Sequence, residues 1–257
     1  MKDEGTMVLV VVLFAFARYA GLAGLSYAVC YRLGRRVLQR FKIQPAMPSR
    51  GHIEYELLYS SATACVFALL GVAVYWLYSR GHTTLYTEVD QHGWRYWAFS
   101  LLAVLVVHDA YFYWTHRLLH TRWLYRHVHA VHHRSTNPTP WAAYAFHPAE
   151  ALLEGAVVFP IILLFPVHVA VFAGFLTVVL MANIIGHLGY EFVPARVRHG
   201  WLGRHLTSAT HHNLHHQLFS KNFGYYFMHW DSWMRTAHPN ETHAQGAAPS
   251  RRPERSE

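Results

Sequence analysis

The stretch His108–His133, HDAYFYWTHRLLHTRWLYRHVHAVHH, is the part of the chain on which a prediction of the fold depends most. It contains a His-x-x-x-His motif at 116–120 and a His-x-x-His-His motif at 129–133, and the second motif recurs at 212–216 within HHNLHH. Residues three and four apart share one face of a helix, so each motif would direct two or three imidazoles to one place. Imidazole is the commonest metal ligand in proteins. The spacing therefore predicts a histidine-rich metal centre.

The composition around this stretch is that of a membrane protein. Of the 257 residues, 53% are hydrophobic and only 14% are charged, where a soluble domain carries about a quarter. The formal net charge of +8 is concentrated beside apolar segments and no nucleic-acid motif accompanies it, so we expect no nucleic-acid partner. The two cysteines, Cys30 and Cys65, form no C-x-x-C pair and indicate neither a disulfide framework nor a cysteine zinc site.

Apolar segments on both sides of the histidines predict an all-α, polytopic fold. Residues 7–30 and 57–79 are each long enough to cross a bilayer, and a third span runs from Trp94 to about His108. Residues 149–186 are almost wholly apolar but are interrupted by Pro160 and Pro166. We expect a hairpin of two short spans that turns near Pro166. The total is about four to five transmembrane helices.

Charge asymmetry predicts the orientation. The segment 31–56 carries Arg32, Arg35, Arg36, Arg40, Lys42 and Arg50, and the positive-inside rule places such a loop in the cytoplasm. The two histidine regions can share one site only if the chain crosses the membrane an even number of times between them. We therefore expect residues 115–148 and 187–257 to form a cytoplasmic, helical, metal-binding cap.

Four other kinds of protein could also carry such a histidine cluster. A zincin protease needs a glutamate beside the first histidine, but Arg117, Leu118 and Leu119 fill His116-x-x-x-His120. A disordered metal-storage tract would be a low-complexity repeat, whereas aromatic and aliphatic residues separate these histidines. A metal transporter would carry ionisable residues along its spans, where only Arg18 and His168 qualify. A metal-binding membrane protein without catalytic activity stays open.

The remaining histidines stand alone and are interpreted as packed or surface residues. They are His52, His82, His92, His168, His199, His205, His229, His238 and His243.

The motifs supply eight histidines, which exceeds the three or four ligands of one zinc and suits two metals. Imidazole binds zinc, copper, iron and nickel, so spacing alone does not name the metal.

Several motifs together resemble those of a known family. They are His108–His120, the HAVHH box at 129–133, STNPTP at 135–140, FHP at 146–148, GHLGYE at 186–191 and HHNLHH at 211–216. In this combination the chain resembles the fatty acid hydroxylase / sterol desaturase superfamily, and most of all its sterol C-5 desaturase-like branch. The resemblance covers roughly residues 100–236. It implies a catalytic domain over 91–238. The apolar segments before this domain predict N-terminal transmembrane helices over 1–90, and the polar, Pro/Ala/Arg-rich composition after it predicts a disordered tail over 239–257.

The resemblance implies an integral-membrane di-iron enzyme, which uses O2 and two electrons to hydroxylate or desaturate a C–H bond of a sterol-like or fatty acyl lipid. Its motifs place nine ligands here: His116, His120, His129, His132, His133, His187, His212, His215 and His216. Other branches have a further histidine where this chain has Asn183, which could hold a metal-bound water or simply lie in a helix. His147 and His211 are alternative ligands. Asp109 and Glu191 suit a role as acceptors for a ligating imidazole.

The chain shows no motif for gathering electrons itself, because it has neither a G-x-G-x-x-G fingerprint nor a cysteine cluster. We expect a separate donor of the ferredoxin or cytochrome type to dock on a basic surface. That surface would comprise Arg117, Arg122, Arg126, Arg134, Arg196, Arg198 and Arg204. The lipid would enter from the bilayer through a channel lined by residues such as Phe112, Tyr113, Trp114, Phe146 and Phe159.

Overall fold

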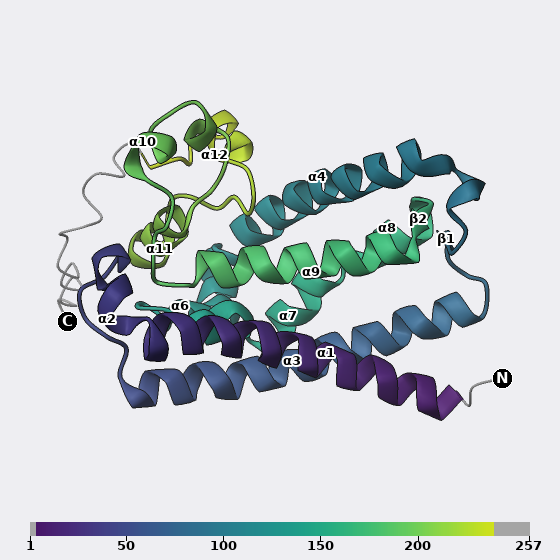
Figure 1. Cartoon of the computed structure of the whole chain (residues 1–257), viewed down its shortest axis with the longest axis horizontal. Helices are drawn as coiled ribbons and strands as arrows, with labels where there is room; N and C mark the ends of the chain where they lie inside the picture. The colour runs from purple at the N-terminus through teal and green to yellow at the C-terminus, as the bar shows by residue number, and fades with distance from the viewer. Residues whose placement is uncertain (1–3, 239–257) are drawn as a thin grey trace.

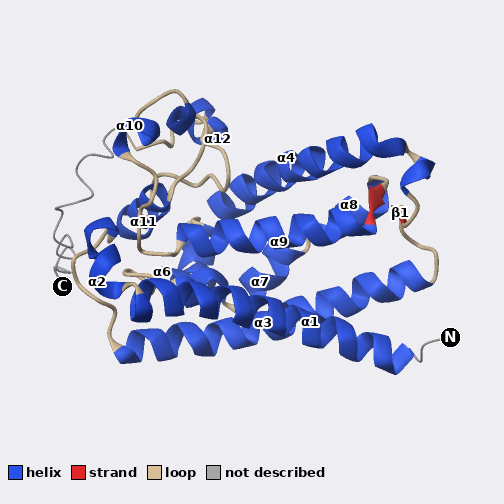
Figure 2. Ribbon diagram, viewed as in Figure 1, coloured by secondary structure: helices blue, strands red, loops and turns tan. Residues whose placement is uncertain are grey.

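Four long helices organise the chain (Figures 1 and 2). The structure is a computed structural model that describes residues 4–238. The helices are α1 (Glu4–Tyr27, extended by the π-helical η1, Ala28–Leu33), α3 (Arg50–Ser79), α4 (Gly93–Leu119) and α9 (Val169–Gly186). Each is long and apolar enough to cross a membrane. The prediction of an all-α, polytopic membrane protein is confirmed. The tail predicted to be disordered, 239–257, lies outside the described residues.

The short elements gather at the two ends of the long helices (Figure 1). One end, which we call the cap, carries α2 (Arg35–Leu38), η2 (Gln39–Phe41), α5 (Arg122–Leu124), η4 (Tyr125–His129), α6 (Ala130–His133), η5 (Pro140–Tyr144), α10 (Ala195–Arg198), η6 (Leu202–Arg204), α11 (Ala209–Leu218) and α12 (His229–Trp233). The opposite end carries β1 (Leu85–Tyr86), η3 (Val89–Gln91) and β2 (Val167–His168), and β1 pairs with β2 in parallel. Both histidine regions therefore lie at the same end of the helices, as predicted.

The predicted hairpin at 149–186 is only half right. Its second half is the span α9, but its first half is two short helices, α7 (Pro148–Gly155) and α8 (Val158–Leu164), and neither is long enough to span alone. The chain does turn at Pro166, between α8 and β2. Short buried helices suit this half because it carries the carboxylates Glu150 and Glu154, which a lipid-facing helix would expose to hydrocarbon. The number of long spans in the described chain is thus four.

The third predicted span is the first part of a longer helix. α4 continues past His108 as one helix to Leu119. It therefore carries His116 out of the apolar layer and into the cap. His120 is its C-cap residue.

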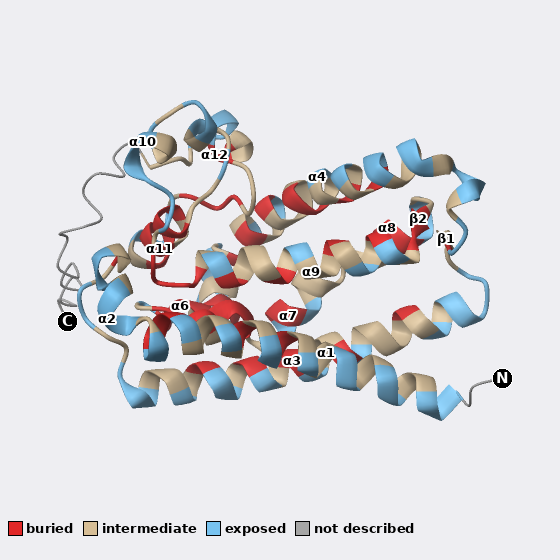
Figure 3. Cartoon of the chain, in the orientation of Figure 1, coloured by how far each residue is buried: buried red, intermediate tan, exposed pale blue. Residues whose placement is uncertain are grey.

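Buried residues concentrate where the cap meets the spans (Figure 3). Tyr19 of α1 stacks on Tyr144, with ring centroids 4.5 Å apart, and its hydroxyl donates to the Trp141 carbonyl at 2.9 Å. Outward positions such as Leu13 and Leu69 are 58% and 68% exposed, as expected of side chains that face lipid rather than a protein core.

Polar side chains of the first spans fix the loop 135–140 that leads out of α6. The fully buried Glu56 accepts hydrogen bonds from both the backbone N–H and the hydroxyl of Thr139. The Tyr31 hydroxyl contacts the carbonyls of Pro138 (3.1 Å) and Leu188 (2.9 Å). Gly189 has φ +72°, and a Cβ there would lie 2.4 Å from the Tyr31 hydroxyl, so only glycine fits. α1 and α3 thereby position the histidine segments of the cap.

Candidate metal centre

Nine histidines converge in the cap as two adjacent sets. The first set comprises His116, His120, His129, His133 and His215, and the second comprises His132, His187, His212 and His216. Within each set, one ligand atom from every residue lies within 4.8 Å of all the others. The sets adjoin, since the ring centroids of His133 and His216 are 4.8 Å apart. These are the nine histidines predicted from sequence.

The Nε2 atoms of each set point at a common centre. In the first set, Nε2 of His120 lies 3.1 Å from that of His129 and 3.2 Å from those of His133 and His215. In the second set, Nε2 of His187 has three such neighbours at 2.9–3.2 Å. One proton cannot satisfy three nitrogens at once, so these contacts are not explained as hydrogen bonds. A cation at the centre of each set would satisfy all of them.

The spacing fits a metal with more than four ligands. With metal–nitrogen bonds of about 2.1 Å, nitrogens about 3.0–3.2 Å apart subtend roughly 90–100°, whereas tetrahedral ligands would be about 3.4 Å apart. The first set also offers five imidazoles, one more than a tetrahedral site accepts. The residues present therefore fit two metals of higher coordination number better than tetrahedral zinc.

Helical periodicity explains how adjacent histidines are divided between the sets. Each residue turns about 100° around a helix, so neighbours in sequence point in different directions and residues four apart point together. His129 and His133 accordingly share the first set, while His132 joins the second. In α11, His215 and its neighbour His216 are divided in the same way. A π-helical turn, η4, precedes α6, and such turns are frequent at functional sites.

Hydrogen bonds on the far side of the rings hold four imidazoles in place. Nδ1 of His129 donates to Glu150 at 2.8 Å, and Nδ1 of His116, His187 and His215 donate to backbone carbonyls at 2.7–3.0 Å. A donated Nδ1–H leaves the Nε2 lone pair free for a metal and fixes the ring orientation. Sequence reasoning missed Glu150. The feature that could have pointed to it is a carboxylate inside an apolar stretch, two residues after Pro148.

Burial also keeps the imidazoles neutral. Desolvation, followed by the neighbouring His116, lowers the pKa of His120 to about 2, and desolvation lowers that of His187 to about 4. Desolvation likewise holds the pKa values of His129, His133 and His215 well below the usual 6.5. Neutral nitrogens are the form that binds a metal, so protons compete little for these sites at neutral pH.

The predicted acceptor roles of Asp109 and Glu191 are wrong. Asp109 accepts from the backbone N–H groups of Tyr226 (2.8 Å) and Phe227 (3.2 Å), and Glu191 accepts from the N–H and hydroxyl of Thr210 at the start of α11. Both carboxylates satisfy free backbone donors in the cap, a demand that sequence does not reveal. They support the segments that carry the histidines.

The alternative ligands lie outside both sets. His147 caps α7 by accepting from the Ala149 N–H, and His211 forms a capping box with Ser208 at the start of α11. The side-chain amide of Asn183 donates to the Ala143 carbonyl at 2.6 Å, and the backbone carbonyl of Asn183 accepts from Nδ1 of His187. Its role in holding a metal-bound water stays a prediction. No lone histidine within 4–238 belongs to either set, and His243 lies outside the described residues.

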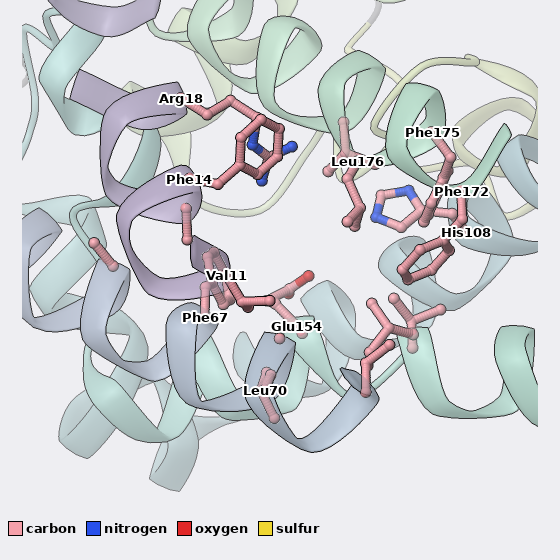
Figure 4. A pocket seen from close by; sticks show the side chains of 18 of the residues that line it. Val11, Phe14, Arg18, Phe67, Leu70, His108, Glu154, Phe172, Phe175 and Leu176 are labelled. Carbon is pink, nitrogen blue, oxygen red and sulfur yellow. The ribbon is translucent and has the colours of Figure 1, made fainter. Parts of the chain in front are cut away.

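An apolar cavity of about 320 Å³ lies beneath the centre, between α1, α3, α4, α7 and α9 (Figure 4). Two of its lining rings touch the histidines, since Phe146 lies 4.9 Å from His132 and Phe112 lies 5.0 Å from His116, centroid to centroid. The prediction that these two phenylalanines line a lipid channel agrees with the cavity. Tyr113, Trp114 and Phe159 do not line it.

Comparisons with known proteins identify the family. The model of the fatty acid hydroxylase family matches residues 101–236. The chain is also 30% identical over 235 residues to lathosterol oxidase of Rattus norvegicus, an alignment covering 90% of this chain and 74% of the rat protein. The chain belongs to the fatty acid hydroxylase family. Its match to Delta(7)-sterol 5(6)-desaturase ERG3B of Gibberella zeae is 36% identical over 154 residues, 60% of this chain and 46% of that protein.

The resemblance seen in the sequence is thereby confirmed, for both the superfamily and the sterol C-5 desaturase-like branch, and with it the class of enzyme, an oxidoreductase. The chain spans about half the length of the Gibberella desaturase and 60% of that of human lathosterol oxidase, to which it is 30% identical over 186 residues. No solved structure matches the chain.

Proposed function

We propose that this fatty acid hydroxylase family member is a membrane di-iron oxidoreductase that uses O2 and two electrons to desaturate or hydroxylate a C–H bond of a sterol-class lipid. The observation that carries the proposal is the convergence of nine imidazole nitrogens, in sets of five and four, directly above an apolar cavity. The sterol class is inferred from the relatives, which are Delta(7)-sterol 5(6)-desaturases and lathosterol oxidases.

The protein's own residues would bind the metals, orient the imidazole rings and exclude water from the reacting bond. The nine imidazoles would hold the two irons, which supply the O2 chemistry that an unactivated C–H bond requires. Glu150 and the backbone carbonyls keep the rings aimed at the two sites. Phe112 and Phe146 separate the sites from the cavity with apolar surface, which keeps water away from the bond that reacts. A lipid in the cavity would present its C–H bond to this surface.

The route of entry is from the bilayer. Phe14 and Tyr78 line the cavity and are also 58% and 37% exposed, so the cavity opens on the lipid-facing side near α1 and α3. An apolar substrate can therefore reach the centre without crossing water. This arrangement suits a sterol or another membrane lipid better than a soluble metabolite.

The electron donor is proposed to be a separate acidic protein of the ferredoxin or cytochrome type. Five arginines of the cap are exposed around the histidine sets: Arg122, Arg126, Arg134, Arg196 and Arg204. The other two predicted members are less suitable, because Arg198 is buried 4.0 Å from Glu191 and Arg117 lies over the rings of Tyr113 and Trp114. The docking surface is thus smaller than the sequence predicts.

The test of function is reconstituted turnover. Purified protein with reduced ferredoxin, O2 and lathosterol should yield a product two hydrogens lighter or one oxygen heavier, measured by mass spectrometry. Because opposite charges steer association, the rate should fall steeply with added salt, and replacing the five exposed arginines by glutamine should raise the apparent KM for the donor. Turnover with NADPH alone, without a second protein, would contradict the separate donor.

The cap is proposed to face the cytoplasm, since the arginine-rich segment 31–56 lies at the same end of the helices as both histidine regions. In a Cys65→Ser background, a membrane-impermeant maleimide applied from outside should label Glu88→Cys but not Ser220→Cys. Both native positions are exposed, at opposite ends of the molecule. Labelling of Ser220→Cys alone would reverse the orientation.

A further inference from the structure

The cavity beneath the centre is apolar except for a few groups that its surroundings leave unsatisfied. Arg18 of α1, His108 of α4 and Glu154 of α7 line it from three different elements, and Figure 4 shows their side chains around the same opening. Nε and Nη1 of Arg18 and Nδ1 of His108 are buried without a hydrogen-bond partner within residues 4–238. Arg18 and Glu154 form no salt bridge with each other in this part of the chain. Unpaired nitrogens that line a cavity together with a carboxyl group indicate a polar ligand group.

The position of Arg18 makes a purely structural role for its charge energetically unfavourable. It lies near the middle of the membrane-spanning segment Glu4–Leu33, too far from either end for its side chain to reach water along the helix. An ionised side chain at that depth is expensive, and such residues normally face a functional cavity and a partner. Its guanidinium carbon lies 6.0 Å from the centre of the Phe14 ring, which does not replace hydrogen-bond acceptors.

The donors and acceptors of the lining select the chemistry of the partner. A carboxylate or sulfate brings acceptors for Arg18 but no proton for the free nitrogen of His108, and an ammonium group brings donors but no acceptor for Arg18. A hydroxyl suits both, because its oxygen accepts from the guanidinium while its hydrogen is donated to Glu154 or to the free nitrogen of His108. A neutral alcohol is therefore the group that leaves the fewest buried atoms unpaired.

The site is close enough to the centre to position a reacting bond. His108 lies eight residues before the ligand His116 on α4, about 12 Å along the helix, and Glu154 lies one turn from Glu150, about 6 Å. A hydroxyl held there places the carbons next to it beneath Phe112 and Phe146, the rings that touch the histidines.

We propose that Arg18 and Glu154, together with His108, form a binding site for the hydroxyl group of a neutral lipid alcohol, and that this site sets which C–H bonds of the lipid lie beneath the histidine centre. The proposal deepens the proposed function, on which its choice of a sterol alcohol rests. Arg18 and Glu154 act here as specificity-determining residues for the lipid.

Equilibrium binding of tritiated lipids to the full-length protein in nanodiscs tests the site. The probes are lathosterol, its 3-deoxy analogue, which lacks the oxygen, and its sulfate ester. The wild-type protein should bind the alcohol about tenfold more tightly than the deoxy analogue or the sulfate, since only the alcohol satisfies both donor and acceptor. In Arg18→Met and Glu154→Leu the preference for the alcohol over the deoxy analogue should fall below about threefold, whereas binding of the deoxy analogue should be unchanged.

Two controls separate a lost site from a damaged protein. Arg95→Gln, which removes an exposed charge at the opposite end, should keep the tenfold preference. Arg18→Lys retains a donor and should recover part of the preference that Arg18→Met loses. If the wild-type protein binds the alcohol and the deoxy analogue equally, binds the sulfate most tightly, or keeps its preference in both variants, the hydroxyl site is refuted.

A second pair of probes distinguishes the site from the sterol assignment. Hexadecanol and hexadecane offer the same comparison, with and without the hydroxyl group, on a linear chain. If hexadecanol shows the Arg18-dependent preference while no sterol binds, the hydroxyl site stands and the sterol substrate is wrong. If lathosterol is turned over but shows no Arg18-dependent preference, the proposed function stands and the hydroxyl site is wrong.

Discussion

Replacing His129 or His215 by alanine is expected to abolish turnover and to lower the bound iron to about one per chain or less. Both side chains belong to the first histidine set, and both are almost completely buried, at 1% and 0% exposure. The vacated space is enclosed, so water replaces the lost nitrogen poorly, and its far-side acceptor, Glu150 or the Lys221 carbonyl, loses its donor. Iron by elemental analysis and turnover by mass spectrometry check the result on the same preparation.

Two other histidines provide matched controls. His82→Ala changes an exposed residue at the end opposite the cap and should alter neither property. His147→Ala removes the N-cap of α7 and should lower stability by about 1 kcal/mol while both irons stay bound. Loss of iron from His147→Ala, with full occupancy in His129→Ala, would show that the ligands have been assigned incorrectly.

Glu150→Ala is expected to reduce metal affinity or turnover by roughly 10–100-fold, the usual effect of removing the acceptor behind a ligating histidine. Glu150 is 1% exposed and accepts from Nδ1 of His129 at 2.8 Å. Without it, the Nδ1–H is buried and unpaired, and nothing fixes which ring nitrogen faces the metal. Titration of the apoprotein with ferrous iron, followed by activity, measures the change.

The conservative variant separates orientation from packing. Glu150→Gln keeps an oxygen that can accept from His129, so its loss should be smaller than that of Glu150→Ala. Glu54→Gln, which breaks only an exposed ion pair with Arg50, should have no effect on iron binding. Equal losses in Glu150→Ala and Glu54→Gln would show that Glu150 does not support the centre.

Part of the histidine centre could be predicted from sequence because that part of its geometry is local. Spacings of four residues fix which imidazoles share a direction on a helix, and this pairs His116 with His120 and His212 with His216. The expectation that each His-x-x-His-His motif serves one place was wrong, because both motifs are divided between the two sets. Apolar length likewise predicted the spans, since bilayer thickness sets the length of a helix. Both kinds of inference need only neighbours within one element.

The features that sequence reasoning missed depend on contacts between distant elements. Glu150 is 21 residues from His129, and Asp109 is 117 residues from Tyr226, so no local sequence pattern predicts either hydrogen bond. The short helices α7 and α8 replaced a predicted span because burial among other helices removed the need for one long apolar helix. The lack of hydrogen-bond partners for the guanidinium nitrogens of Arg18 becomes apparent only when α1, α4 and α7 are placed around one cavity.

The central claim is that the two histidine sets hold two irons that support lipid oxidation. Protein purified under reducing conditions should contain close to two irons per chain, and turnover should rise in proportion to iron content when the apoprotein is reloaded. Zinc outranks ferrous iron in the usual affinity order, so metal content and activity must be measured on the same samples. One iron per fully active chain, or full activity with zinc in place of iron, would contradict the account.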